Sequence, residues 1–199
     1  MTDCGCELEA DGDEQRRTLR VVLAINAAMF IVEIVAGLLA SSTGLIADSL
    51  DMLADASVYA ISLYAIGRAS KIRSRAATAS GVLQIVLGFG VLIEAIRRFI
   101  GGGEPIGVAM MAMGIVALIA NAVCLRMIAK HKRGDVNFRA SYIFSANDVI
   151  ANIGVIVSGL LVFTLGSQLP DLIIGVVIAA VVVRGGFKIL GETRAVAAA

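Results

Sequence analysis

Charge is scarce in this chain. Only 17% of its 199 residues are Asp, Glu, Lys or Arg, whereas 58% are hydrophobic and the mean hydropathy is +0.89. A soluble domain of this length has too small a core to bury so much apolar surface. The composition therefore excludes an ordinary soluble domain and predicts that lipid is the solvent for most of the chain.

Cysteine is also rare, and its positions argue against a disulfide framework. Cys4 and Cys6 lie in an acidic amino-terminal stretch, and Cys124 lies in an apolar run, where a free thiol behaves as a small hydrophobic group. The first residues lack the positive charge and the directly following apolar stretch of a cleaved secretory signal. We therefore expect residues 1–18 to form a cytoplasmic tail.

Histidine occurs once, as His131, in a basic loop where we expect the side chain to be solvated. The apolar runs contain no histidine, no nucleophile paired with a base and no glycine-rich phosphate loop. These absences argue against an enzyme, and we expect no resident cofactor.

What the chain does have is a series of six apolar runs, each about as long as the roughly 20 residues that a helix needs to cross a bilayer core of about 30 Å. They cover residues 19–40, 44–66, 76–96, 106–128, 140–165 and 169–190. Gly, Ser and Pro mark the breaks after the first, third and fifth runs, which is typical of turns. The sequence predicts an all-α membrane protein, a six-transmembrane-helix bundle over 19–190, with a short cytoplasmic tail at 191–199 and no second domain.

The basic residues predict the orientation of this bundle. Of the 17 basic residues, 15 lie in or near the termini or near the breaks after the second and fourth runs. The two exceptions are Arg97 and Arg98. Because positive charge accumulates on the cytoplasmic side, we expect both termini to be cytoplasmic, in a multi-pass protein of the bacterial inner membrane. Orientation alone accounts for these short basic loops, so we expect no nucleic-acid partner, and the surrounding partner is the lipid bilayer.

Three acidic side chains interrupt the second apolar run. Asp48, Asp51 and Asp55 are spaced i, i+3 and i+7, which keeps them within roughly 60° of one helix face. A mid-membrane aspartate costs about 2.5 to 3.5 kcal/mol on insertion scales, so each needs a partner or a role. An amino-terminal helix cap is the alternative for Asp48, since it lies near the start of the run. For Asp51 and Asp55, which lie deeper, the spacing favours a binding site.

The fifth run offers a complementary face. Asp148 and Asn152 are spaced i, i+4 and both supply oxygen ligands suited to hard or borderline cations. Carboxylates this close repel one another, so without a metal some of them should hold protons. We therefore expect a site that exchanges protons for a metal ion. Glu94 has Arg97 and Arg98 as ready partners and is interpreted as structural, whereas Glu33 is left undecided.

These motifs resemble the transmembrane domain of the cation diffusion facilitator family, the zinc-exporter type of secondary transporter. The resemblance covers nearly the whole chain. It rests on residues 47–55 (ADSLDMLAD), on residues 147–155 (NDVIANIGV), and on Pro170-Asp171 and Arg184-Gly185-Gly186 in the last run. It implies that Asp51 and Asp55 are metal ligands and that the chain exports a divalent metal.

One ligand of the family pattern is missing. The family usually has His four residues before the Asp that aligns with Asp148, and this chain has Phe144 there. We choose Asn152 as the replacement, with Ser145, Asn147 and Asn26 as alternatives. An all-oxygen site suits Mg, Mn and Fe(II) relatively better, but the resemblance implies Zn or Cd.

Family members commonly carry a cytoplasmic carboxy-terminal domain that binds metal and holds a dimer. Only residues 191–199 follow the last run, so we expect this chain to lack that domain and to form a homodimer through its transmembrane helices. Cys4 and Cys6, with nearby carboxylates, are a further candidate for transient capture of a soft cation. The alternatives to a metal exporter are a non-transporting membrane interaction protein and a channel or transporter for organic cations.

Overall fold

The computed structural model describes the backbone of residues 4–65, 70–130 and 136–198, and the side chains of residues 13–61, 63–64, 75, 78–79, 81–130 and 145–191. The described backbone is almost entirely helical and contains no strand. Its six helices are α1 (Cys4–Leu39), α2 (Thr43–Ala65), α3 (Ser70–Gly101), α4 (Gly107–Ala129), α5 (Val136–Leu165) and α6 (Leu169–Ala198). The prediction of an all-α fold with six helices is confirmed. The helix α1 begins upstream of the predicted first span and runs without interruption through it.

The helices present apolar side chains to the outside. Leu39 is 77% exposed and Ile100 is 80% exposed, and many other large apolar residues are exposed along the bundle. Among the described residues, four stretches are long and apolar enough to cross a membrane, Asp13–Leu39, Gly107–Ala129, Ser145–Leu165 and Leu169–Gly191. The helix α2 differs from these because three aspartates lie within its 23 residues. The chain is an all-α membrane protein.

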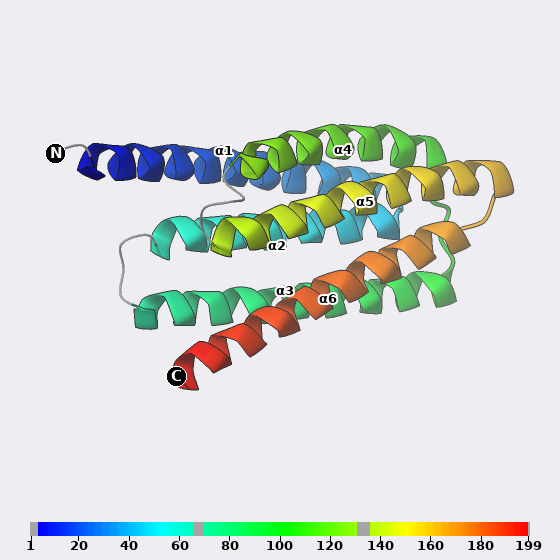
Figure 1. Ribbon diagram of the computed structural model, residues 1–199. Helices are drawn as coiled ribbons and strands as arrows, with labels where there is room; N and C mark the ends of the chain where they lie inside the picture. Colours follow the sequence, from blue (N-terminus) through cyan, green and yellow to red (C-terminus); the bar gives the residue numbers. More distant parts are fainter. Residues whose placement is uncertain (1–3, 66–69, 131–135, 199) are drawn as a thin grey trace.

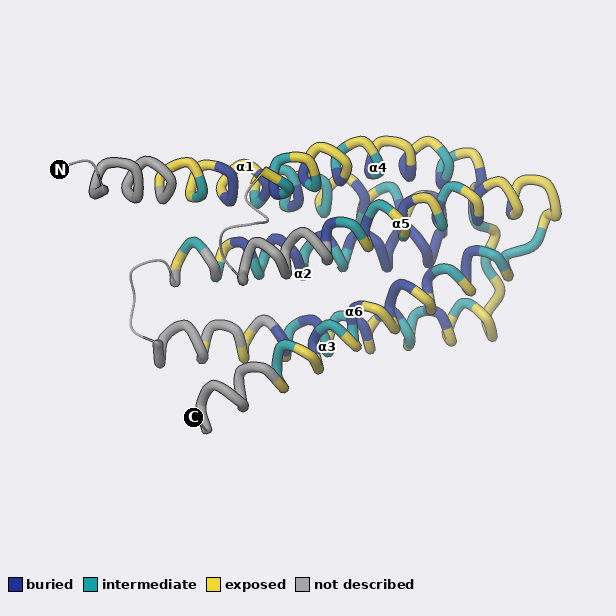
Figure 2. Tube along the Cα trace, viewed as in Figure 1, coloured by how far each residue is buried: buried dark blue, intermediate teal, exposed yellow. Residues whose placement is uncertain are grey.

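Successive helices run in opposite directions, and both termini lie at the same end of the bundle, as Figure 1 shows. The most extensive packing is between α3 and α6, between α4 and α5, and between α1 and α2. The helix α2 contacts each of the other helices, although its contact with α5 is small. In Figure 2 the buried side of each helix faces the bundle interior and the exposed side faces outward. The helix that carries Asp48, Asp51 and Asp55 is therefore the central one.

Glycines allow α3 and α6 to pack closely. A Cβ atom on Gly81 would lie 3.0 Å from the carbonyl oxygen of Gly186, and a Cβ on Gly186 would lie 2.7 Å from the carbonyl oxygen of Gly81. A Cβ on Gly88 would meet Val183 and would lie 3.1 Å from the carbonyl oxygen of Ala179. Small residues at such crossings let helix backbones approach in lipid, where packing drives association.

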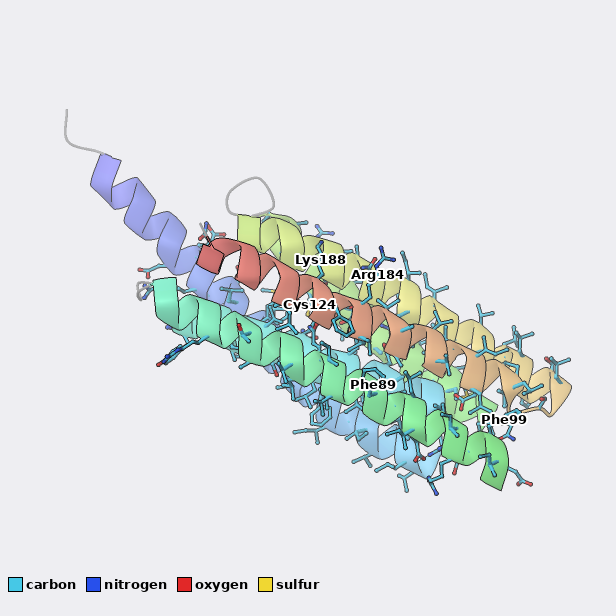
Figure 3. The ribbon with its side chains drawn as sticks, turned by 90° about the horizontal axis from the view of Figure 1, so that it is seen from below. Phe89, Phe99, Cys124, Arg184 and Lys188 are labelled. Atoms are coloured by element: carbon cyan, nitrogen blue, oxygen red, sulfur yellow. The ribbon has the colours of Figure 1, made fainter. Side chains whose placement is uncertain are left out.

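The outer surface of this pair is apolar in its membrane part and basic toward the termini. Figure 3 labels Phe89 and Phe99 on α3, which are 49% and 65% exposed, and Arg184 and Lys188 on α6, which are also exposed. This gradient fits a helix pair whose middle faces lipid and whose terminal end faces water.

Candidate metal site

The acidic stripe of α2 faces the interior of the bundle. Asp48 is 1% exposed and Asp55 is 6% exposed, and Asp51, between them, is half-buried. Because α2 contacts every other helix, side chains on this stripe meet protein rather than lipid. The spacing that predicts a shared face thus corresponds to a buried one.

Asp148 of α5 meets this stripe from the opposite side. It is 8% exposed, and its carboxyl group lies within hydrogen-bonding reach of both Asp51 and Asp55. These contacts occur where α2 and α5 otherwise touch little. Asp148 therefore lies near both of the predicted ligands of α2, between two helices.

Tyr59 adds a hydroxyl group that the sequence argument missed. Its side chain is 2% exposed, and its hydroxyl donates a hydrogen bond to Oδ2 of Asp55 with 3.3 Å between the oxygens. Tyr59 follows Asp55 by four residues and so extends the same helical stripe, which is the signal that would have found it.

Asn152 lies one turn beyond Asp148 and is fully buried. Its Nδ2 donates a hydrogen bond to the backbone oxygen of Asp148 at 2.7 Å, which fixes the side-chain amide. Its Oδ1 is buried and has no hydrogen-bond partner among the described residues. A buried amide oxygen left without a donor is available as a ligand to a cation.

The alternative ligands named from the sequence lie in different environments in the structure. Ser145 is 1% exposed on α5, whereas Asn147 is exposed and so does not share the buried face of Asp148. Asn26 of α1 is buried and donates hydrogen bonds to the backbone oxygen of Val22 at 2.9 Å and to Sγ of Cys124 at 3.7 Å. Cys124, labelled in Figure 3, is a buried free thiol. The side chains of Phe144, Cys4 and Cys6 lie outside the described residues.

The start of α2 is capped by residues other than Asp48. The hydroxyl of Ser42 accepts a hydrogen bond from the backbone N–H of Leu45 at 3.1 Å, and Asp171 of α6 accepts from the N–H groups of Thr43 and Gly44. The helix begins at Thr43, so Asp48 lies five residues inside it and cannot reach the first free amides. The cap interpretation of Asp48 is wrong.

Asp48 instead faces Glu33 of α1. Glu33 is fully buried, and its carboxyl group lies within hydrogen-bonding reach of that of Asp48. Ionised carboxylates only accept hydrogen bonds. Both Oε atoms of Glu33 and Oδ2 of Asp48 accordingly have no donor among the described residues.

Among the residues whose side chains the structure describes, no basic group forms an ion pair with these acids. The ion pairs among the described residues join Glu94 to Arg97 and Arg98, both at the far end of α3. That geometry supports the structural interpretation of Glu94. Within the described part of the chain, no three Asp, Glu, His or Cys side chains form a ready-made metal centre. Among the described residues, the arrangement is a cluster of facing carboxyl groups without a basic partner, and burying them in the ionised form is costly.

The fold and this cluster define a helical membrane protein with an acidic centre inside the bilayer. A family model described as the cation efflux transmembrane domain matches residues 19–196, so the chain belongs to the cation diffusion facilitator, or cation efflux, family. This confirms the resemblance drawn from the motifs.

Curated relatives agree with this assignment. The chain is 23% identical over 194 residues to the zinc transporter ZitB of Yersinia pseudotuberculosis, covering 91% of this chain and 62% of that protein. It is 24% identical over 196 residues to the cadmium, cobalt and zinc/H(+)-K(+) antiporter of Bacillus velezensis, covering 92% and 63%. It is 27% identical over 174 residues to the metal cation efflux system protein CzcD of Cupriavidus metallidurans, covering 81% and 55%. The chain thus spans less than two thirds of the length of these relatives.

Proposed function

We propose that this chain exports a divalent transition-metal cation from the cytoplasm in exchange for protons. Asp51, Asp55 and Asp148 bind the ion, with Asn152 as the fourth ligand. Both termini are cytoplasmic in this proposal, and Zn²⁺ or Cd²⁺ is the cargo.

The observation that carries the proposal is the contact of Asp148 with Asp51 and Asp55 across the α2–α5 interface. Burying ionised carboxylates without a counterion is costly, so the cluster must take up protons or a metal ion. Protons and metal then compete for the same oxygens, and the carboxylates titrate as a coupled group. Competition of this kind is the chemical basis of an exchanger.

The small contact between α2 and α5 supports a site that opens to either side. Two helices with so small a contact can separate without breaking an extensive interface between them. Metal entering from the cytoplasm displaces protons from the three aspartates, and protons entering from the other side release it. A tenfold proton gradient supplies about 1.4 kcal/mol per proton to this cycle.

The identity of the metal rests on two opposing arguments. Relatives named as zinc transporters and as a cadmium, cobalt and zinc antiporter favour Zn²⁺ or Cd²⁺. The donor set favours a second candidate, Mn²⁺ or Fe²⁺, because Asp and Asn supply only oxygen and Phe144 stands where the family has His. A transport assay with all four ions decides between them.

The test is metal-dependent proton flux in proteoliposomes that contain a pH-sensitive dye. We expect saturable flux in the wild type and its loss in each of Asp51→Asn, Asp55→Asn and Asp148→Asn, which keep side-chain volume but remove charge. Asn147→Ala is the matched control, because Asn147 adjoins Asp148 yet is exposed, and it should retain flux.

Wild-type liposomes without flux, or aspartate variants with full flux, would rule out the exporter and favour a non-transporting membrane interaction protein. Flux that never saturates with metal would favour a channel. The homodimer that the family resemblance implies stays a prediction.

A further inference from the structure

Glu33 is a buried acid that the proposed exchange site does not use. It lies inside the span of α1, is 0% exposed, and has no hydrogen-bond donor to either carboxylate oxygen among the described residues. An acid in this position is expensive in a membrane protein and marks a functional position unless a partner balances it. The charged groups that act on it among the described residues, Asp48 and Asp51, are acidic as well and so do not balance its charge.

The neighbours of Glu33 come from the acidic stripe of α2. Its carboxyl group lies within hydrogen-bonding reach of Asp48 and within electrostatic range of Asp51. Asp48 also has an unpartnered buried oxygen. Because α1 and α2 pack extensively, this contact is held by the interface around it, as the closeness of Gly37 to Leu45 and Ile46 illustrates. Two carboxylates from two helices are therefore fixed facing each other.

This pair is displaced from the exchange site along the axis of α2. Asp48 precedes Asp51 by three residues, which is about 4.5 Å along a helix. The displacement is toward the α1–α2 turn, at the end of the bundle opposite the two termini (Figure 1). Glu33 and Asp48 therefore lie between the Asp51, Asp55 and Asp148 cluster and that end of the bundle.

We propose that Glu33 and Asp48 form a second binding site for a divalent cation, a transit site on the path between the exchange site and the end of the bundle that contains the α1–α2 turn. The assignment rests on the proposed function, since the cation is the transported one. This site has two side-chain ligands, whereas the proposed exchange site has four, so it binds a Zn²⁺ or Cd²⁺ ion more weakly than the exchange site does. Weak binding is what a transit site needs, because the ion must leave it.

Two facing carboxyl groups could also share a proton instead of binding a cation. The variant Glu33→Gln distinguishes these two explanations. A glutamine amide donates to Asp48 as a protonated glutamate does, so a proton-sharing pair tolerates the change, whereas a cation site loses half of its charge.

The experiment is equilibrium binding of Cd²⁺ to the full chain in lipid nanodiscs, with Cys4 and Cys6 changed to Ser to remove binding by thiols. We expect a tight and a weak class of sites in this background. Glu33→Gln and Asp48→Asn should abolish the weak class and keep the tight one, and Asp148→Asn should do the reverse. Glu94→Gln removes an acid that is paired with arginine, and it should keep both classes.

A weak class that persists in both Glu33→Gln and Asp48→Asn overturns the transit site and leaves the exchange site standing. A tight class that persists in Asp148→Asn overturns the exchange site instead. If Glu33→Gln does not fold, Asp48→Asn alone decides the question, because it changes the other member of the pair.

Discussion

The carboxylate of Asp171, at the start of α6, accepts a hydrogen bond from the backbone N–H of Thr43, at the start of α2, with 2.6 Å between the nitrogen and Oδ2. The same carboxylate accepts from the N–H of Gly44 at 3.0 Å and from the hydroxyl of Ser42 at 2.6 Å. One side chain of α6 thus satisfies the free amides at the start of another helix, and it fixes the end of α2 from which the acidic stripe begins.

We predict that Asp171→Ala lowers the free energy of unfolding by about 1 to 3 kcal/mol, because it leaves two buried N–H groups without an acceptor. Asp171→Asn keeps an acceptor oxygen and should cost less. Unfolding by SDS, followed by circular dichroism, measures both variants. Equal stability of wild type and Asp171→Ala would contradict the capping role.

The α3–α6 crossing predicts contrasting effects for two nearby glycines. Gly88→Val should destabilise the bundle by about 1 to 3 kcal/mol, because a side chain there meets Val183 and the backbone of Ala179. A Cβ atom on Gly90 would have nothing within 4 Å. Gly90→Ala should therefore stabilise the protein slightly, by no more than about 1 kcal/mol. The same SDS titration tests the pair, and similar losses in both would refute close packing at Gly88.

Tyr59→Phe removes the hydroxyl that donates to Asp55. A single hydrogen bond contributes about 0.5 to 1.5 kcal/mol, so we expect a roughly 2- to 10-fold weaker apparent affinity for the transported metal. The flux at saturating metal should change little, because the carboxylates are intact. Tyr64→Phe, at a 51% exposed position on the same helix, is the control. Metal titration of proton flux gives both quantities, and an unchanged affinity would mean that the hydroxyl does not act on the site.

Cys124 should be inert in the folded protein. Its side chain is 1% exposed, so a water-soluble maleimide should label it only after SDS unfolds the chain. The measurement uses a chain with Cys4 and Cys6 changed to Ser. Adding Glu104→Cys at an exposed position of the α3–α4 connection gives a thiol that should react at once. Rapid labelling of Cys124 in the native protein would show that water reaches the interior beside Asn26.

The sequence predicts best those features that depend on the geometry of a single helix. The positions of the helices follow from apolar runs, and the shared face of Asp48, Asp51 and Asp55 follows from helical spacing. Both agree with the structure because they depend on local geometry. The ion pairs of Glu94 were likewise predictable, since Arg97 and Arg98 lie one turn away on the same helix.

Contacts between residues on different helices could not be predicted from the sequence. The sequence leaves the role of Glu33 undecided, because the rotation of α1 about its axis determines which residue Glu33 faces. No spacing within α1 indicates that this residue is Asp48. Asp48 was open to a cap interpretation because the true cap, Asp171, lies more than a hundred residues away along the chain. Asp148 was assigned to the site by chemistry and by family pattern, whereas its contact with Asp51 and Asp55 depends on how α5 packs.

The central position of α2 also bears on how the chain enters the membrane. From Thr43 to Tyr59 no residue of α2 is exposed, and three aspartates lie in this stretch. Such a segment is costly to insert by itself, because each acid opposes transfer into lipid. Its extensive packing on α1 offers a partner that is synthesised just before it. We therefore expect α1 and α2 to insert as a hairpin, in which the three aspartates make the second helix dependent on the first during assembly.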